Sequence, residues 1–332
     1  MNKLLNRVTG VVLLILLLIT GVCWAAPREK QLTKVTVLLD WVPNTNHTGL
    51  YVAQALGYYR DEQLDVRILQ PATGGGADLV AAGKGDFAVG YQEQVTYALT
   101  AEHPLPIKAI AALIQHNTSG FASPAAKGIK SPKDFEGKIY GGWGSPMEEA
   151  MLRGLMKKYG VDFQKLRMVN IGEADFFASV QKDVDFSWIY FGWDGVAAQV
   201  KNFPIHFIEL REVDPRLDYY TPLLVAGNSL LQKKPALVRK FLRATAKGYR
   251  YAVAEPEKAA AILVKAAPEI DRKLAAASQK YLAKQYIADA PRWGEMKTAI
   301  WEGYAGWMLE NGLIKRKLLV NEAFSNEFLP SK

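Results

Sequence analysis

The sequence predicts an α/β protein made of two lobes. Short apolar segments bounded by turn residues alternate with segments of helical apolar spacing, as is typical of parallel sheets whose strands are connected by helices. This alternation begins at Val35–Leu39 and begins again at Lys138–Gly142, after a polar break at Gln115–Gly120. An apolar segment at Leu223–Ala226 has the character of a strand that returns to the first sheet.

The chain is therefore expected to cross between the lobes twice. Residues 33–117 plus 222–332 would build lobe I, and residues 118–221 would build lobe II. Two crossovers make a hinge, and a cleft between two lobes is a natural place for a ligand. A continuous single-domain α/β protein is the alternative.

The expected elements follow in order along the chain. In lobe I we expect strands at Val35–Leu39, Val66–Leu69, Asp86–Gly90 and Ile107–Ile114, and helices at Gly49–Leu56 and Ala77–Ala82. In lobe II we expect strands at Lys138–Gly142, Leu166–Asn170 and Val184–Tyr190, and helices at Glu148–Tyr159 and Phe176–Gln181. Beyond Lys234 the chain is rich in Ala, Lys, Leu and Glu at helical spacing, which predicts helices to its end.

The first 25 residues are expected to be a secretory signal peptide. They combine a positively charged start, the aliphatic segment Val11–Thr20 and a small-x-small site that ends at Ala25. Cleavage after Ala25 would export the mature chain to the periplasm. The alternative is a lipoprotein acylated at Cys23, although Val22 is bulky where a lipobox has a small residue.

Composition excludes several function classes. Cys23 is the only cysteine, so the mature chain would have no disulfide, thiolate nucleophile or sulfur metal ligand. The 41 basic and 33 acidic residues are scattered, and no basic stripe is interleaved with aromatic residues, so nucleic acid is not an expected partner.

Four segments that leave predicted strands share aromatic, carboxylate and amide side chains. These segments are Trp41–His47, Gly90–Gln94, Gly141–Glu149 and Trp188–Asp194. In open α/β sheets, ligands bind beyond the carboxyl ends of the strands, so these segments are the expected ligand site. The candidate binding residues are Trp41, Asn44, His47, Tyr91, Glu93, Ser145, Glu149, Trp188, Tyr190, Trp193 and Asp194.

This mixture of side chains suits a flat heteroaromatic ligand. Tryptophan and tyrosine faces stack on a π system, and a carboxylate accepts hydrogen bonds from an exocyclic amine. Glu93 is the first candidate for that carboxylate, with Glu149 or Asp194 behind it. Glu148 and Glu149 also occupy the first turn of a predicted helix, where they would repel an anion. The glycine run at 74–76 is the remaining candidate anion site, but a flexible turn explains it better.

Signals for catalysis, cofactors and metals are poor. The four histidines show no metal-ligand spacing, and neither HExxH nor GxSxG occurs. Residues 83–88 match GxGxxA formally, but they lie between a predicted helix and a predicted strand, and a dinucleotide site needs the opposite order. We therefore expect no cofactor, no metal and no catalytic residues.

Four long segments resemble one family. They are LDWVPNTNHTGLYVAQALGYY, GDFAVGYQEQVTYA, GGWGSPMEEAMLRGLMKKYG and VDFSWIYFGWDG. They resemble the ABC-transporter substrate-binding proteins related to thiamine-pyrimidine biosynthesis proteins, and among these the branch that binds formylaminopyrimidine. The resemblance covers about residues 32–330 and implies a type II periplasmic-binding-protein fold.

The same superfamily contains enzymes that make the thiamine pyrimidine from an active-site histidine and pyridoxal phosphate. Those enzymes carry a lysine and a histidine where this chain has Gly90 and Gln94. They also carry a cysteine-rich motif where this chain has Tyr219–Pro222. Both departures argue against an enzyme. Binders of alkanesulfonates, taurine and nitrate form a second alternative, which the acidic residues of the predicted site disfavour.

The resemblance therefore implies a periplasmic binding component of an ABC importer. Its ligand would be an aminopyrimidine precursor of thiamine, formylaminopyrimidine or hydroxymethylpyrimidine, taken up for thiamine salvage. Its protein partners would be a membrane permease and an ATPase, and the binding component itself would be a monomer.

Overall fold

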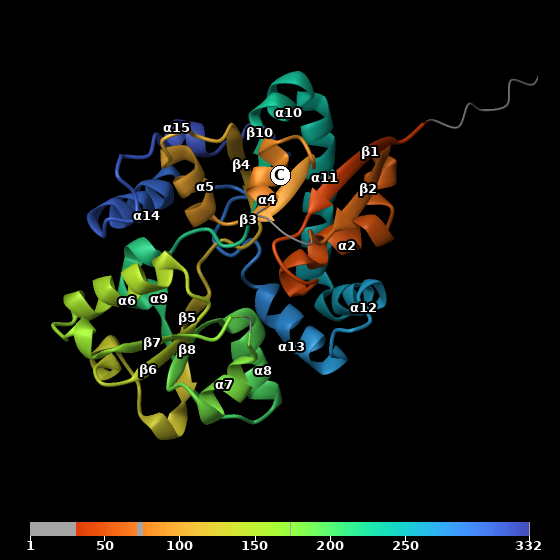
Figure 1. Cartoon of the computed structure of the whole chain (residues 1–332). Helices are drawn as coiled ribbons and strands as arrows, with labels where there is room; N and C mark the ends of the chain where they lie inside the picture. Colours follow the sequence, from red (N-terminus) through yellow and green to blue (C-terminus); the bar gives the residue numbers. More distant parts are fainter. Residues whose placement is uncertain (1–30, 72–75, 173, 332) are drawn as a thin grey trace, which may run out of the picture. The chain divides into compact units, whose positions relative to one another are not determined.

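Two five-stranded sheets organise residues 31–71, 76–172 and 174–331, which are the residues that the computed structural model describes (Figure 1). The first sheet has the strand order β2-β1-β3-β10-β4, and the second has the order β7-β6-β8-β5-β9. The first sheet contains β1 (Thr33–Leu38), β2 (Leu64–Leu69), β3 (Phe87–Gly90), β4 (Ile107–Ala112) and β10 (Leu223–Gly227). The second contains β5 (Ser119–Pro124), β6 (Ile139–Gly142), β7 (Arg167–Asn170), β8 (Phe186–Tyr190) and β9 (Ile205–Glu209).

The two sheets match strand for strand. In each, three parallel strands lie side by side, β2-β1-β3 in the first sheet and β7-β6-β8 in the second. The next strand, β10 or β5, runs in the opposite direction. It pairs in turn with the edge strand β4 or β9, which runs in the same direction as the three parallel strands. The strands β1 and β6 therefore hold equivalent places. Both sheets are mixed, so the expectation of parallel sheets is corrected for β10 and β5.

Both faces of each sheet are buried. In β3, Phe87 and Val89 belong to one apolar cluster while Ala88 belongs to another, because successive strand residues point to opposite faces. In β5, Phe121 and Ala122 divide in the same way between two clusters. Helices cover these faces, which is why the central strands β3 and β10 are apolar and buried throughout.

The helices of the described chain agree with the predicted helical regions at 48–55, 76–81, 146–158 and 176–182 and beyond Lys234, whereas those at 58–61, 92–100, 196–200, 210–213 and 228–233 were not predicted. The helices are α2 (Thr48–Ala55), α3 (Tyr58–Asp61), α4 (Gly76–Ala81), α5 (Gln92–Thr100), α6 (Pro146–Lys158), α7 (Phe176–Lys182), α8 (Val196–Val200), α9 (Leu210–Val213), α10 (Asn228–Lys233), α11 (Pro235–Ala254), α12 (Pro256–Ala266), α13 (Arg272–Leu282), α14 (Thr298–Glu310) and α15 (Val320–Ala323). A 3-10 turn, η1 (Thr45–His47), precedes α2, and a π-helical turn, η5 (Phe191–Gly195), precedes α8. None of the helices in the described ranges is long and apolar enough to cross a membrane.

Helix α14 packs on the cores of both sheets. Its Trp301 and Ala305 belong to a cluster of the first sheet. Its Tyr304, Trp307 and Met308 belong to a cluster of the second sheet. We propose residues 33–117 plus 222–332 as lobe I and residues 118–221 as lobe II because the strands of each sheet fall within one of these sets. Helix α14 then connects the two lobes in addition to the crossovers.

Two predicted features lie outside the described residues. The predicted signal peptide at 1–25, with Cys23, is one of them. Most of the glycine run at 74–76 is the other, since the described chain resumes at Gly76.

Candidate functional site

The loop after β1 is organised by Asp40, Asn44 and His47. The backbone N–H of Asn44 donates to Nδ1 of His47 over 3.2 Å, so the imidazole proton resides on Nε2. That nitrogen donates to Oδ1 of Asp40 over 2.6 Å. The Asn44 side chain accepts from the N–H of Asn46 and donates to the Val42 carbonyl. Asn44 and His47 are buried, and these bonds shape the loop.

Asp40 connects this loop to the segment after β3. The hydroxyl of Tyr91, at the N-terminus of α5, is close enough to the Asp40 carboxylate to affect its pKa. Burial by itself raises the pKa of Asp40, but His47 and Tyr91 outweigh it and hold that pKa below its usual value. Asp40 is therefore an ionised carboxylate beside Tyr91. Sequence reasoning did not include it among the binding residues.

Glu93, in the first turn of α5, has the most informative environment of the predicted site. Burial, followed by the nearby Glu148 carboxylate, raises the pKa of Glu93 to about 7. The charge of Glu93 in turn contributes to the raised pKa values of Tyr91, Tyr97, Tyr190, Tyr219 and Tyr304. These tyrosines come from elements of both sheets, so the fold gathers them around one carboxyl group.

Glu148 lies in α6, the helix that follows β6 of the second sheet. It is fully buried, and its Oε1 accepts from the Tyr140 hydroxyl over 2.5 Å and from the Trp143 N–H over 3.1 Å. Its Oε2 accepts from the Ser145 N–H over 2.8 Å, which completes a capping box for α6. The sequence pattern Ser145-x-x-Glu148 could have revealed this role, which our sequence reasoning missed.

We call Asp40, Tyr91, Glu93, Tyr97, Glu148, Tyr190, Tyr219 and Tyr304 the Glu93 cluster. No lysine or arginine in the described ranges is among the groups that set the pKa values of Asp40, Glu93 or the tyrosines of the cluster. The cluster is therefore rich in hydrogen-bonding hydroxyl and carboxyl groups.

The other predicted residues lie in varied environments. Trp41 is 42% exposed, whereas Trp188 is nearly buried and its Nε1 has no hydrogen-bond partner in the described structure. Trp193 packs on an apolar cluster of the first sheet. Burial, to which Asp175 adds, raises the pKa of Asp194 to about 6.

Two predicted residues at the start of α6 are engaged in other contacts. The Ser145 Oγ accepts from the Met147 N–H and so caps the helix. Glu149 is about half exposed and forms an ion pair with Arg153 one turn along the helix. The structure thus brings Tyr91, Glu93 and Tyr190 together, and it places Glu149 on a solvent-facing surface of α6.

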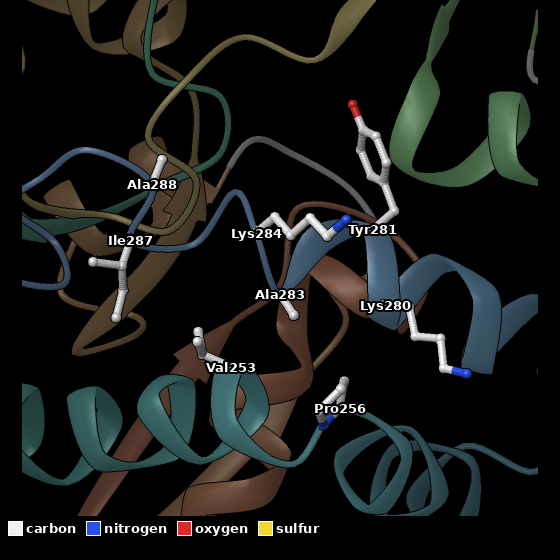
Figure 2. A pocket seen from close by; sticks show the side chains of 8 residues that line it. All are labelled: Val253, Pro256, Lys280, Tyr281, Ala283, Lys284, Ile287 and Ala288. Carbon is white, nitrogen blue, oxygen red and sulfur yellow. The ribbon is translucent and has the colours of Figure 1, made fainter.

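A cavity of about 840 Å³ lies elsewhere, among α11, α12 and α13 (Figure 2). Its lining residues are Val253, Pro256, Lys280, Tyr281, Ala283, Lys284, Ile287 and Ala288. None of them belongs to the Glu93 cluster or to the predicted binding residues. Its size alone does not make it the ligand site, because the convergent polar groups lie at the strand ends.

The fold defines the class of protein. Two mixed five-stranded sheets of matching order, with two crossovers between them, form the fold of the periplasmic binding proteins. The periplasmic aliphatic sulphonate binding protein SsuA from Escherichia coli superimposes with a TM-score of 0.64 over 87% of this chain and 91% of its own, at 16% identity.

The family follows from the sequence comparison. This chain belongs to the NMT1/THI5-like family, whose model matches residues 44–259. A formylaminopyrimidine-binding protein from Halalkalibacterium halodurans is 25% identical over 96% of this chain and 98% of its own. A 4-amino-5-hydroxymethyl-2-methylpyrimidine phosphate synthase from Legionella pneumophila is also 25% identical, over 90% of this chain and 93% of its own. The family therefore contains both binding proteins and enzymes.

Proposed function

We propose that this protein is the periplasmic solute-binding component of an ABC importer and that it binds an aminopyrimidine precursor of thiamine. The ligand would be formylaminopyrimidine or hydroxymethylpyrimidine, taken up for thiamine salvage. The observation that carries the proposal is the environment of Glu93, a partly buried carboxyl group that lies near several tyrosines and has a pKa raised to about 7.

Such a carboxyl group matches the edge of an aminopyrimidine. That edge presents an amine donor next to a ring nitrogen acceptor. A protonated carboxyl group can donate to the ring nitrogen while its other oxygen accepts from the amine. Because the pKa of Glu93 lies near neutral pH, both forms of the group are accessible when the ligand arrives. Trp41, nearly half exposed at the end of β1, would supply a stacking face.

The same environment disfavours an anionic ligand. Sulphonate, taurine or nitrate would bring negative charge near the carboxyl groups of Asp40, Glu93 and Glu148. Among the described residues, no lysine or arginine contributes to the pKa shifts of Asp40 and Glu93, so none is close enough to offset that charge. The N-terminus of α6, which would attract an anion, already donates its N–H groups to Ser145 and Glu148. This reasoning favours the pyrimidine over the sulphonate alternative.

The residues at the enzyme positions support a binding protein. Gly90 has no side chain, and a Cβ there would lie 2.7 Å from Oε1 of Gln94. That site has neither the lysine nor the histidine of the pyrimidine-forming enzymes. The segment Tyr219–Pro222 has no cysteine. We therefore propose no catalytic residues and no cofactor, and we expect purified protein to show no visible absorbance from pyridoxal phosphate.

The transport partners follow from the class of protein. We propose that the signal peptide at 1–25 directs the chain to the periplasm. The ligand-bound protein, as a monomer, would then dock on a membrane permease that a cytoplasmic ATPase drives.

Titration calorimetry on residues 26–332 tests the proposal. The panel contains formylaminopyrimidine, hydroxymethylpyrimidine, thiamine, taurine and an alkanesulfonate. We expect binding of a pyrimidine and no heat from the sulphonates. We expect Glu93→Gln to weaken binding by about 1.5–3 kcal/mol, because a neutral amide cannot make the charge-assisted hydrogen bond that the carboxylate makes to the amine.

Glu149→Gln is the matched control, since that carboxylate is exposed and paired with Arg153. It should leave the affinity unchanged. Binding of a sulphonate with the pyrimidines inert would reject the proposed ligand. Unchanged pyrimidine affinity in Glu93→Gln would remove Glu93 from the site.

A further inference from the structure

Trp143 and Trp41 are the two most exposed tryptophans in the described ranges. Trp143 is 44% exposed and Trp41 is 42% exposed, whereas Trp188, Trp293, Trp301 and Trp307 are buried. A tryptophan side chain left in water forgoes a large amount of hydrophobic burial. Two such side chains at strand ends therefore call for an explanation.

The two tryptophans occupy equivalent places in the two sheets. Trp41 follows β1, which lies between the parallel strands β2 and β3. Trp143 follows β6, which lies between the parallel strands β7 and β8. Each tryptophan thus lies in the loop beyond the carboxyl end of β1 or β6, the strand that is second in the spatial order of its sheet, and α/β proteins bind ligands at such strand ends.

The backbone around Trp143 is held in a defined position. Its N–H donates to Oε1 of the buried Glu148, and the following Ser145 N–H donates to Oε2. A Cβ at Gly142 would lie 1.9 Å from that Oε1, and Gly144 has a φ of +82° that favours glycine. The chain can therefore wrap around the Glu148 carboxylate only because glycines flank Trp143.

The ring of Trp143 is also supported on one side. It contacts the ring of the nearly buried Trp188 at a centroid distance of 5.7 Å and an interplanar angle of 52°. This contact holds one part of the indole against the second sheet and leaves the rest in solvent. A side chain that is held in this way loses little further conformational entropy when a ring stacks on it.

Both tryptophans are attached to neighbours of Glu93. Glu148, which accepts the Trp143 N–H, is close enough to Glu93 to affect its protonation. Asp40, which precedes Trp41, lies close enough to Tyr91, two residues before Glu93, for each group to affect the pKa of the other. The carboxyl group and the two exposed rings thus belong to one connected set of contacts.

We propose that Trp143 provides a stacking face for the ring of the ligand whose amino edge binds Glu93, opposite the face provided by Trp41. This inference rests on the proposed function and identifies a specificity-determining residue that sequence reasoning did not single out. Three aromatic residues among the predicted binding residues are less suited to this role. Trp188 lies beneath Trp143, Trp193 packs on the first sheet, and Tyr190 lies within the Glu93 cluster.

The test compares Trp143→Ala, Trp143→Phe and the control Leu319→Ala. Leu319 is the most exposed large apolar residue of the described chain and lies far along the sequence, just before α15. Stacking of a base on an aromatic side chain is worth roughly 1–3 kcal/mol, so Trp143→Ala should weaken formylaminopyrimidine binding about tenfold to a hundredfold. Trp143→Phe should retain most of the affinity, and Leu319→Ala all of it.

Fluorescence gives a second readout. A pyrimidine stacked on Trp143 should quench its emission, so Trp143→Phe should show less quenching than the wild type at saturation. Thermal unfolding of each variant checks that it is folded. Wild-type affinity in a folded Trp143→Ala variant overturns the inference and leaves the proposed function intact. A wild-type protein that binds no pyrimidine overturns both.

Discussion

Nδ1 of His116 lies 2.7 Å from Oδ2 of Asp218, and this contact ties the first crossover between the sheets to the second. The other ring nitrogen, Nε2, lies 2.9 Å from Oδ1 of Asp289. An ionised carboxylate only accepts hydrogen bonds, so both ring nitrogens must donate, and the imidazole must carry a proton on each. His116 is thus a cation shared by two carboxylates, and Lys297 pairs with the free oxygen of Asp289.

We expect His116 to make stability depend on pH. The hydrogen bond to Asp218 is the main cause that raises the pKa of His116 above its ordinary value, and burial, which lowers that pKa, offsets only part of this effect. Because this pKa is higher in the folded chain than in the unfolded chain, protonation of His116 adds to the free energy of unfolding. The full contribution is present at pH values below the unfolded pKa of about 6.5. That stability is lost as the pH rises through the folded value.

His116→Gln tests this expectation. It should lower the free energy of unfolding by about 1–2 kcal/mol at pH 6, because one or two hydrogen bonds between charged groups are lost from a partly exposed site. At pH 9 the difference from the wild type should shrink. Urea unfolding at both values measures it, and a difference that stays constant would show that His116 is not the titrating group.

Glu93 should have a stability effect that is separate from ligand binding. Its pKa is about 7 in the folded chain, against 4.5 ordinarily, so the folded protein holds the proton more tightly than the unfolded chain does. The free energy of unfolding should therefore fall as the pH rises from about 4.5 to 7. Glu93→Gln should stabilise the ligand-free protein at pH 8 by at most about 3 kcal/mol.

The comparison at pH 4 completes that test. There the wild-type carboxyl group is protonated in both states, and the variant should have nearly the same stability. Glu149→Gln again serves as the control, because an exposed pair one helical turn apart contributes only about 0.3–0.5 kcal/mol. A variant less stable than the wild type at pH 8 would contradict the burial of Glu93.

Two helical glycines should respond in opposite directions to alanine. A Cβ at Gly248 of α11 would lie 2.0 Å from the carbonyl oxygen of Gly49 in α2, so Gly248→Ala must push the two helices apart. Overpacking of this kind costs about 1–3 kcal/mol. Gly306 of α14 has nothing within 4 Å of the same position, so Gly306→Ala should stabilise by about 0.5–1 kcal/mol.

Thermal or urea unfolding of the two variants measures this pair. Because α2 follows the Trp41 loop, Gly248→Ala should also weaken ligand binding. Gly306→Ala should leave it unchanged. Equal effects of the two substitutions would mean that α2 and α11 do not approach as closely as described.

Most strands were predictable because their apolar residues form uninterrupted runs. The strands β1, β2, β3, β4, β6, β7, β8 and β10 all overlap segments expected from the sequence. The fold class was confirmed as well. The sequence analysis missed two strands, β9 and β5, and the β5 segment Ser119–Pro124 has a single large apolar side chain. Its Gly120 is required by the pairing with β9, since a Cβ there would lie 2.2 Å from the Ile208 carbonyl oxygen.

The candidate site was predictable only in part. The composition of the loops after the strands pointed to Glu93, Tyr91 and Tyr190, which the structure brings together. It did not identify Glu148 as a neighbour of Glu93, and it gave no reason to prefer Trp143 over Trp188. Those distinctions depend on contacts between segments far apart along the chain.

The sequence by itself determined most of the strands, several of the helices and their order, because strand and helix periodicity are local properties of neighbouring residues. Only the tertiary structure decided the electrostatic character of the site. The pKa of Glu93 rises because folding removes that carboxyl group from water and brings the Glu148 carboxylate close to it. Desolvation and charge proximity arise from packing in space, and no pattern along the chain encodes them directly.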